Sequence, residues 1–167
     1  VKTMQKQCEK LTLTSRAFHH DKLGEFGERI TTTFGYNKVL PMNTGVEAGE
    51  TAVKIARKYG YEVKGVEPNQ AIVLFPENNF WGRTISASST QSEKESYHNF
   101  GPFPPNLKVI PYNNIQELEK EFQNPNIVAY FLEPIQGEAG VIIPDNGYLR
   151  KVRNLCNKYN VLMIVDE

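Results

Sequence analysis

The chain has 167 residues, of which 40% are hydrophobic and 23% charged, so it can bury a core of ordinary globular composition. Nineteen basic and nineteen acidic residues cancel, which leaves no net field to attract nucleic acid or an anionic membrane surface. The two cysteines, Cys8 and Cys156, form no CxxC pair, so they indicate a reducing, intracellular compartment rather than a disulfide framework or a zinc site.

The first half of the chain shows apolar residues at helical and strand spacings. Leu23, Phe26, Ile30 and Phe34 recur every three or four residues, which predicts a helix over 21–34. The first residues also have the pattern of a helix. The elements predicted next are a strand at 38–42, a helix at 46–59, a strand at 71–75 and a short helix beginning near Gly82.

The second half begins with residues 86–105, which are polar and then rich in Pro, Gly and aromatics. This composition predicts a long surface excursion. The remaining pattern predicts strands at 108–111, 127–132 and 161–165, with helices at 115–122 and 147–159. Continuously apolar strands separated by helices predict an α/β fold with a mainly parallel sheet and helices on both faces. In such sheets ligands bind at the carboxyl ends of the strands.

The first candidate site is the segment from Asn43 to Glu47, between the predicted strand at 38–42 and the helix that follows. Thr44 and Glu47 have the capping-box spacing, so the helix is expected to begin here. Gly45 leaves backbone N–H groups open at the positive end of the helix, where an anion can bind. A capped helix with nothing bound is the alternative. Because no GxGxxG or GxxxxGK[ST] occurs, a single phosphate fits better than a pyrophosphate.

The second candidate site is the segment from Asn79 to Arg83, directly after the strand predicted at 71–75. The adjacent aromatics Phe80 and Trp81 either pack into the core or stack on a planar ligand ring. The guanidinium of Arg83 is suited to hold a carboxylate with two parallel hydrogen bonds.

The third candidate site consists of acids that follow apolar strands. Glu133 ends the strand at 127–132, and Asp166 ends the last strand 33 residues later. An acid after a strand is usually a turn residue or a cap, but two at neighbouring strand ends place two carboxylates in one crevice. A buried carboxylate at Asp166 needs a cation, for which a protonated pyridine nitrogen is suitable. Glu138 lies in the loop after Glu133 and can meet a second cation. Together the sites describe a pocket for a phosphorylated pyridine.

Several longer stretches resemble known proteins. The segments 43–52, 131–141 (FLEPIQGEAGV) and 161–167 resemble the phosphate loop, the EPIQGE segment and the aspartate-bearing strand of the subgroup III pyridoxal-phosphate-dependent aminotransferases. The stretches 11–18, 79–84, 100–103 and 110–113 are similar to the ornithine-specific branch of that family. The resemblance covers essentially the whole chain. It implies that residues 1–167 are the central part of the large, cofactor-binding domain of a fold-type I transferase.

The resemblance also implies how the cofactor, pyridoxal 5'-phosphate (PLP), is held. Thr44, Gly45 and Val46 belong to the phosphate loop, with the N–H groups of Gly45 and Val46 on the phosphate. Phe80 stacks on the pyridine ring. Asp166 pairs with the ring nitrogen and keeps it protonated, so that the ring acts as an electron sink.

Substrate roles follow from the same resemblance. Trp81 and Arg83 lie on the substrate side, where Arg83 binds the carboxylate of the oxo acid. Glu133 lies close to both cofactor and substrate. Glu138 is the switch acid, which alternately pairs with an arginine outside this chain and makes room for the second substrate. No metal site is expected, because the sequence His19-His20-Asp21 has no third ligand at helical spacing.

The reacting lysine of the family is expected beyond Glu167, because no lysine here follows an apolar strand. Both ends of the sequence read as cuts, so the small domain is expected to be absent and the fragment alone is expected to be inactive. The resemblance further implies a homodimer, in the cytoplasm or the mitochondrial matrix.

The implied reaction of the full protein moves the side-chain amine of ornithine to 2-oxoglutarate through PLP. It yields glutamate semialdehyde, which cyclises to pyrroline carboxylate, and glutamate. One alternative is another class III aminotransferase, for acetylornithine or 4-aminobutyrate, since most residues that separate these lie outside the chain. A second alternative is a non-catalytic α/β binding module, which need not keep the lysine. The missing glycine fingerprint disfavours a nucleotide-binding domain.

Overall fold

The computed structural model describes residues 1–15 and 17–167, so Arg16, part of the 11–18 stretch above, lies outside the described residues. The chain divides into two compact units, Val1–Pro41 and Met42–Glu167. No helix in the described part of the chain is both long and apolar enough to cross a membrane.

The first unit contains two helices, α1 (Lys2–Cys8) and α2 (Leu23–Phe34). Helix α2 confirms the helix predicted over 21–34, and it ends at Gly35 in the left-handed conformation that glycine adopts without strain. The strand predicted at 38–42 is wrong, since none of these residues joins a ladder. The apolar pattern there is real, but a strand also needs a partner, and Pro41 has no N–H to donate.

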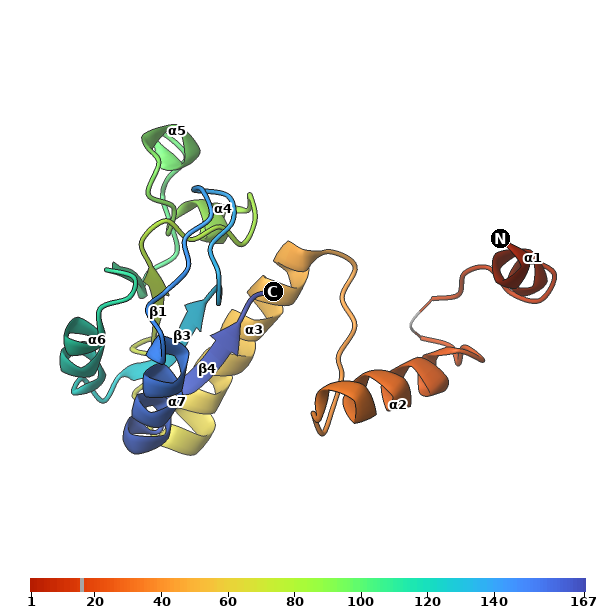
Figure 1. Ribbon diagram of the computed structural model, residues 1–167, viewed down its shortest axis with the longest axis horizontal. Helices are drawn as coiled ribbons and strands as arrows, with labels where there is room; N and C mark the ends of the chain where they lie inside the picture. Colours follow the sequence, from red (N-terminus) through yellow and green to blue (C-terminus); the bar gives the residue numbers. More distant parts are fainter. Residues whose placement is uncertain (16) are drawn as a thin grey trace. The chain divides into compact units, whose positions relative to one another are not determined.

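The second unit is a layered α/β structure (Figure 1). Its helices are α3 (Gly45–Tyr59), the π-helical turn η1 (Gly60–Lys64), α4 (Ile85–Ser88), α5 (Lys94–Tyr97), α6 (Ile115–Phe122) and α7 (Tyr148–Tyr159). Its strands are β1 (Ile72–Pro76), β2 (Leu107–Ile110), β3 (Ile127–Leu132) and β4 (Leu162–Val165). The strands form one parallel sheet in the order β2-β1-β3-β4. This arrangement confirms the predicted fold class and, within one residue at each end, the strands predicted at 71–75, 108–111, 127–132 and 161–165.

Helices cover both faces of the sheet, as predicted (Figure 1). On one face Leu74 and Tyr130 pack with side chains of α6 and α7, and on the other Phe75 and Phe131 pack with those of α3. Adjacent strand residues enter opposite cores because successive side chains of a strand point to opposite faces. A one-residue bulge near Val128 shifts the register between β1 and β3.

The predicted surface excursion at 86–105 is only partly correct. Its first residues are buried, with Ala87 and Thr90 fully inaccessible and Ser88 nearly so. Ala87 and Ser88 belong to α4, and Thr90 follows its C-cap, Ser89. The N-cap of α4 is Thr84, so the short helix predicted near Gly82 begins three residues later at Ile85. Polar composition alone did not reveal that a hydroxyl such as that of Thr90 finds its partners inside the protein.

The sheet order creates a crevice at the carboxyl ends of β1 and β3. The connection leaving β1 leads to β2 on one side, and the connection leaving β3 leads to β4 on the other. Such a point, where the chain departs in opposite directions, is where open α/β sheets bind ligands. The loops after β1 and β3 and the end of β4 therefore surround the candidate site.

Candidate active site

The start of α3 forms the first wall of the site. The Thr44 hydroxyl accepts the N–H of Glu47 at 3.2 Å, and the Glu47 carboxylate accepts the N–H of Thr44 at 2.9 Å, so the predicted capping box is confirmed. Within the described residues, the N–H groups of Gly45 and Val46 have no acceptor. The cap therefore leaves two parallel donors at the positive end of a helix, where an anion binds well. Thr44 itself supports the turn and does not line the cavity.

The loop after β1 forms the second wall, and buried hydrogen bonds fix it. The Asn79 amide donates to the carbonyls of Pro76 and Thr90 at 2.8 and 2.6 Å. The backbone N–H of Phe80 donates to Glu133 at 3.0 Å. Because Phe80 is partly exposed while both of its neighbours are buried, its ring is the group that this loop presents to the site.

Trp81 lies in the core. Its side chain is 5% exposed, its ring stacks on Phe75, and its indole N–H donates to the Thr90 hydroxyl at 2.9 Å. A Cβ at Gly49 would lie only 2.7 Å from the ring, so α3 packs directly against it. Most of the Trp81 side chain therefore packs in the core. Trp81 also lines a cavity at the strand ends, so the substrate contact predicted for it stays a prediction.

Two carboxylates stand at the strand ends. Glu133 accepts N–H groups from two loops, from Phe80 at 3.0 Å and from Gly137 at 3.4 Å. Burial raises the pKa of Glu133; the two N–H donors act in the opposite direction, and the carboxylates of Asp166 and Glu138 add to the rise. Burial also raises the pKa of Asp166, whose backbone N–H is tied to Leu132 at 3.0 Å. Both carboxylates are thus placed where a cation would relieve a desolvation cost.

The walls enclose a cavity of about 760 Å³, the strand-end cavity, whose lining includes Gly45, Val46, Phe80, Glu133 and Asp166. Three of its described lining residues are acidic, Glu167 being the third, and none is lysine or arginine. One part of the wall offers N–H donors and another offers carboxylates. This polarity suits a ligand that is anionic at one end and cationic at the other.

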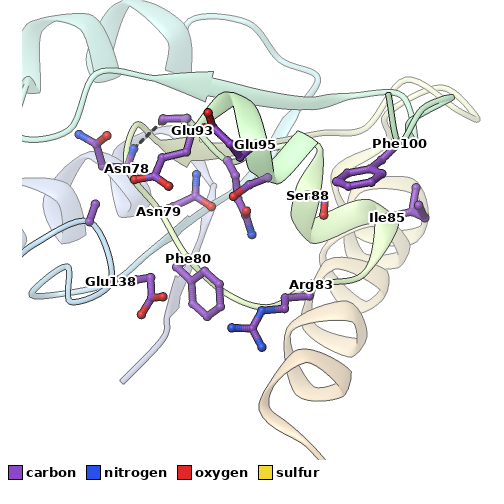
Figure 2. A pocket seen from close by; sticks show the side chains of 14 residues that line it. Asn78, Asn79, Phe80, Arg83, Ile85, Ser88, Glu93, Glu95, Phe100 and Glu138 are labelled. Carbon is purple, nitrogen blue, oxygen red and sulfur yellow. Dashed lines mark hydrogen bonds between the residues drawn. The ribbon is translucent and has the colours of Figure 1, made fainter. Parts of the chain in front are cut away.

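A neighbouring space of about 540 Å³, the loop cavity, holds Arg83 and Glu138. Figure 2 shows the Phe80 ring between the Glu138 carboxylate and the Arg83 guanidinium. The Arg83 carbon Cζ lies 5.9 Å from the centre of that ring, at the outer limit of a cation–π contact. Phe80 lines both cavities, so its ring is the wall that they share.

The structure therefore brings together nearly all the residues that the sequence singled out. Phe80 lines both cavities. The strand-end cavity is also lined by Gly45, Val46, Trp81, Glu133 and Asp166, and the loop cavity by Arg83 and Glu138. Sequence reasoning missed Thr90 and Tyr112. The Tyr112 hydroxyl donates to the carbonyls of Glu133 and Pro134 at 3.0 and 3.2 Å and so fixes the strand end behind the carboxylate. No local motif marks either residue.

The open N–H groups at the start of α3, the Phe80 ring and the strand-end carboxylates thus lie together at the switch point of a parallel sheet. The chain belongs to the class-III aminotransferases, whose family pattern matches residues 1–167.

Particular relatives are more specific. The chain is 57% identical over all 167 residues to the mitochondrial ornithine aminotransferase of Rattus norvegicus, and it covers 38% of that protein. It matches the crystal structure of the Toxoplasma gondii ornithine aminotransferase with a TM-score of 0.95 and 49% identity, over 98% of this chain and 39% of that one.

A second crystal structure of the Toxoplasma gondii enzyme, with the same TM-score, identity and coverage, has PLP at partial occupancy at its active site. The acetylornithine aminotransferase of Elizabethkingia anophelis is more distant, with a TM-score of 0.80 and 44% identity over 99% of this chain and 37% of that one. The chain thus spans about two fifths of the relatives that it matches.

Proposed function

We propose that the full-length protein is an ornithine–oxo-acid transaminase that uses PLP to transfer the side-chain amine of ornithine to 2-oxoglutarate. The observation that carries the cofactor assignment is the polarity of the strand-end cavity. Among the described residues, two N–H groups at the start of α3 have no acceptor, and no lysine or arginine lines the cavity beside its carboxylates. The identity to ornithine aminotransferases supports the choice of substrate.

The residues of this chain fit PLP. Gly45 and Val46 would hold its phosphate through their N–H groups, and the Phe80 ring would cover one face of the pyridine. Asp166 would hold the proton on the ring nitrogen. Burial disfavours the charged form of its carboxyl and raises its pKa, and a cationic ring nitrogen beside it would offset that cost. When bound, PLP supplies an electron sink for the carbanion formed at the substrate.

Glu133 acts in the proposed site as a fixed acceptor. Its two oxygens are held by N–H groups from the loop after β1 and from the loop after β3. It therefore keeps the Phe80 backbone and the loop carrying Glu138 at a constant distance from each other. Glu133 also lines the strand-end cavity together with Asp166, which supports a position close to both cofactor and substrate.

Arg83 and Glu138 are proposed to let one pocket accept two different substrates. The Arg83 guanidinium is suited to bind a carboxylate of 2-oxoglutarate, because it can donate two parallel hydrogen bonds. Within the described residues neither side chain makes an ion pair. Glu138 is thus free to pair with the arginine that the family supplies from outside this chain.

The reacting lysine is proposed to lie beyond residue 167, since no lysine lines either cavity in the described part of the chain. We therefore propose that residues 1–167 alone have no activity. A homodimer and a location in the cytoplasm or the mitochondrial matrix are further parts of the proposal. They are supported by the family resemblance and, for the matrix, by the mitochondrial name of the rat relative.

Acetylornithine transamination is the second candidate, favoured by the likeness to the Elizabethkingia anophelis structure. The test uses the full-length protein with PLP and adds ornithine without an oxo acid. The expected result is loss of the visible absorption of bound PLP, with pyrroline carboxylate formed in equal amount. Bleaching by acetylornithine or 4-aminobutyrate but not by ornithine would change the substrate and keep the class. A protein that binds no PLP would instead be a binding module.

A further inference from the structure

Thr90 is a fully buried residue that lies two positions after the end of α4 and contacts the loop after β1. It lines neither cavity. Its hydroxyl accepts the indole N–H of Trp81 at 2.9 Å and directs its own proton to Asn79 Oδ1 at 3.1 Å or to the Ala87 carbonyl at 3.0 Å. Its backbone carbonyl accepts the Asn79 amide at 2.6 Å.

These contacts hold the two residues on either side of Phe80. Asn79 is 7% exposed and Trp81 is 5% exposed, and both side chains end on Thr90. The N–H of Phe80 is itself bonded to Glu133. Three consecutive residues are therefore fixed. Of the three, only Phe80 lines both cavities, since Asn79 lines the loop cavity alone and Trp81 lines the strand-end cavity alone.

The buried setting makes the hydroxyl of Thr90 hard to replace. The hydrogen bonds that link the Thr90 hydroxyl to the Trp81 N–H and to Asn79 Oδ1 are buried, so losing this hydroxyl leaves their polar atoms without a partner. The least costly response is a shift of the loop, and any shift of Asn79 and Trp81 moves the residue between them.

We propose that Thr90 is a positioning residue that sets the orientation of the Phe80 ring and, through it, the wall shared by the cofactor and substrate cavities. This inference rests on the proposed PLP function. Thr90 touches neither cavity and acts through Asn79 and Trp81.

The test compares Thr90→Val, which keeps the shape and removes the hydroxyl, with Thr90→Ser, which keeps the hydroxyl, in the full-length protein. The first readout is the circular dichroism of bound PLP per mole of cofactor, which reports the asymmetric surroundings of the ring. The second is the dissociation constant of PLP. For Thr90→Val we expect a several-fold loss of the cofactor signal and about tenfold weaker binding, and for Thr90→Ser values near those of the unmodified protein.

The matched control is Tyr130→Phe, which removes another fully buried hydroxyl, 3.0 Å from that of Tyr148 and on the opposite face of the sheet from Trp81. It should lower the melting temperature without changing the cofactor signal. If Thr90→Val behaves like this control, Thr90 is only a core residue and the inference is overturned.

Two further outcomes are distinguishable. If Thr90→Val does not fold, Trp81→Phe removes the donor end of the same link, and an unchanged cofactor signal in that variant overturns the inference. If the unmodified protein binds no PLP at all, the proposed function falls, and this inference falls with it.

Discussion

Gly49 in α3 offers a direct test of how tightly the core supports the site. Replacing it with alanine removes a poor helix former, which by itself should stabilise the helix by about 1 kcal/mol. The new Cβ, however, would lie 2.7 Å from Trp81 Cε3 and 3.3 Å from Cζ3. To reach an ordinary contact of 3.4 Å the ring must retreat by about 0.7 Å.

The Trp81 ring has little room for that movement. It is stacked on Phe75 at 5.4 Å between ring centres, lies 5.4 Å from Phe131, and is anchored by its N–H to Thr90. Overpacking a well-filled core costs about 1–3 kcal/mol. Since this cost exceeds the gain in helix propensity, we expect Gly49→Ala to destabilise the protein by about 1 kcal/mol or slightly more.

The assay is urea unfolding of the full-length protein without and with PLP. The matched control is Gly27→Ala in the interior of α2, where the added Cβ meets only Val39 Cγ1, at an ordinary 3.5 Å, and a small gain in stability is expected. If Gly49→Ala is as stable as the unmodified protein or more stable, and binds PLP equally well, the contact between α3 and Trp81 is not tightly packed and the reasoning is refuted.

Two further changes test the electrostatics of the strand ends. Burial raises the pKa of Asp166 in the folded protein above its ordinary value of 3.8. Protonation of Asp166 therefore stabilises the fold fully below pH 3.8, and this contribution is lost as the pH rises through the raised pKa. Without PLP, Asp166→Asn should therefore flatten this part of the pH dependence of the free energy of unfolding. The same variant should bind PLP more weakly. An unchanged slope of the free energy against pH would contradict the assignment. Tyr112→Phe should cost about 1 kcal/mol in urea unfolding by removing the hydroxyl bonds to Glu133 and Pro134. The pKa of Tyr112 is raised to about 12, mainly by burial, so the loss should be the same at pH 6 and pH 9, and a loss that varies between them would argue against a neutral donor.

The sequence by itself determined the features that depend on near neighbours. The spacing of Thr44 and Glu47 predicted where α3 begins, because a capping box closes within one turn. Continuous apolar runs predicted the strands, and acids directly after two of them predicted the carboxylates of the site. The sequence also predicted that helices cover both faces, since such runs must be buried on both sides.

Only the tertiary structure decided the features that depend on distant partners. The segment 38–42 has a strand-like pattern but no strand to pair with. Phe80 and Trp81 are adjacent aromatics of similar character, and the sequence cannot say which enters the core. Thr90, nine residues beyond Trp81, and Gly49, on a different helix, decide this, the first by accepting the indole N–H and the second by leaving space for the ring. Burial is set by what packs against a side chain, and that information is spread along the whole chain.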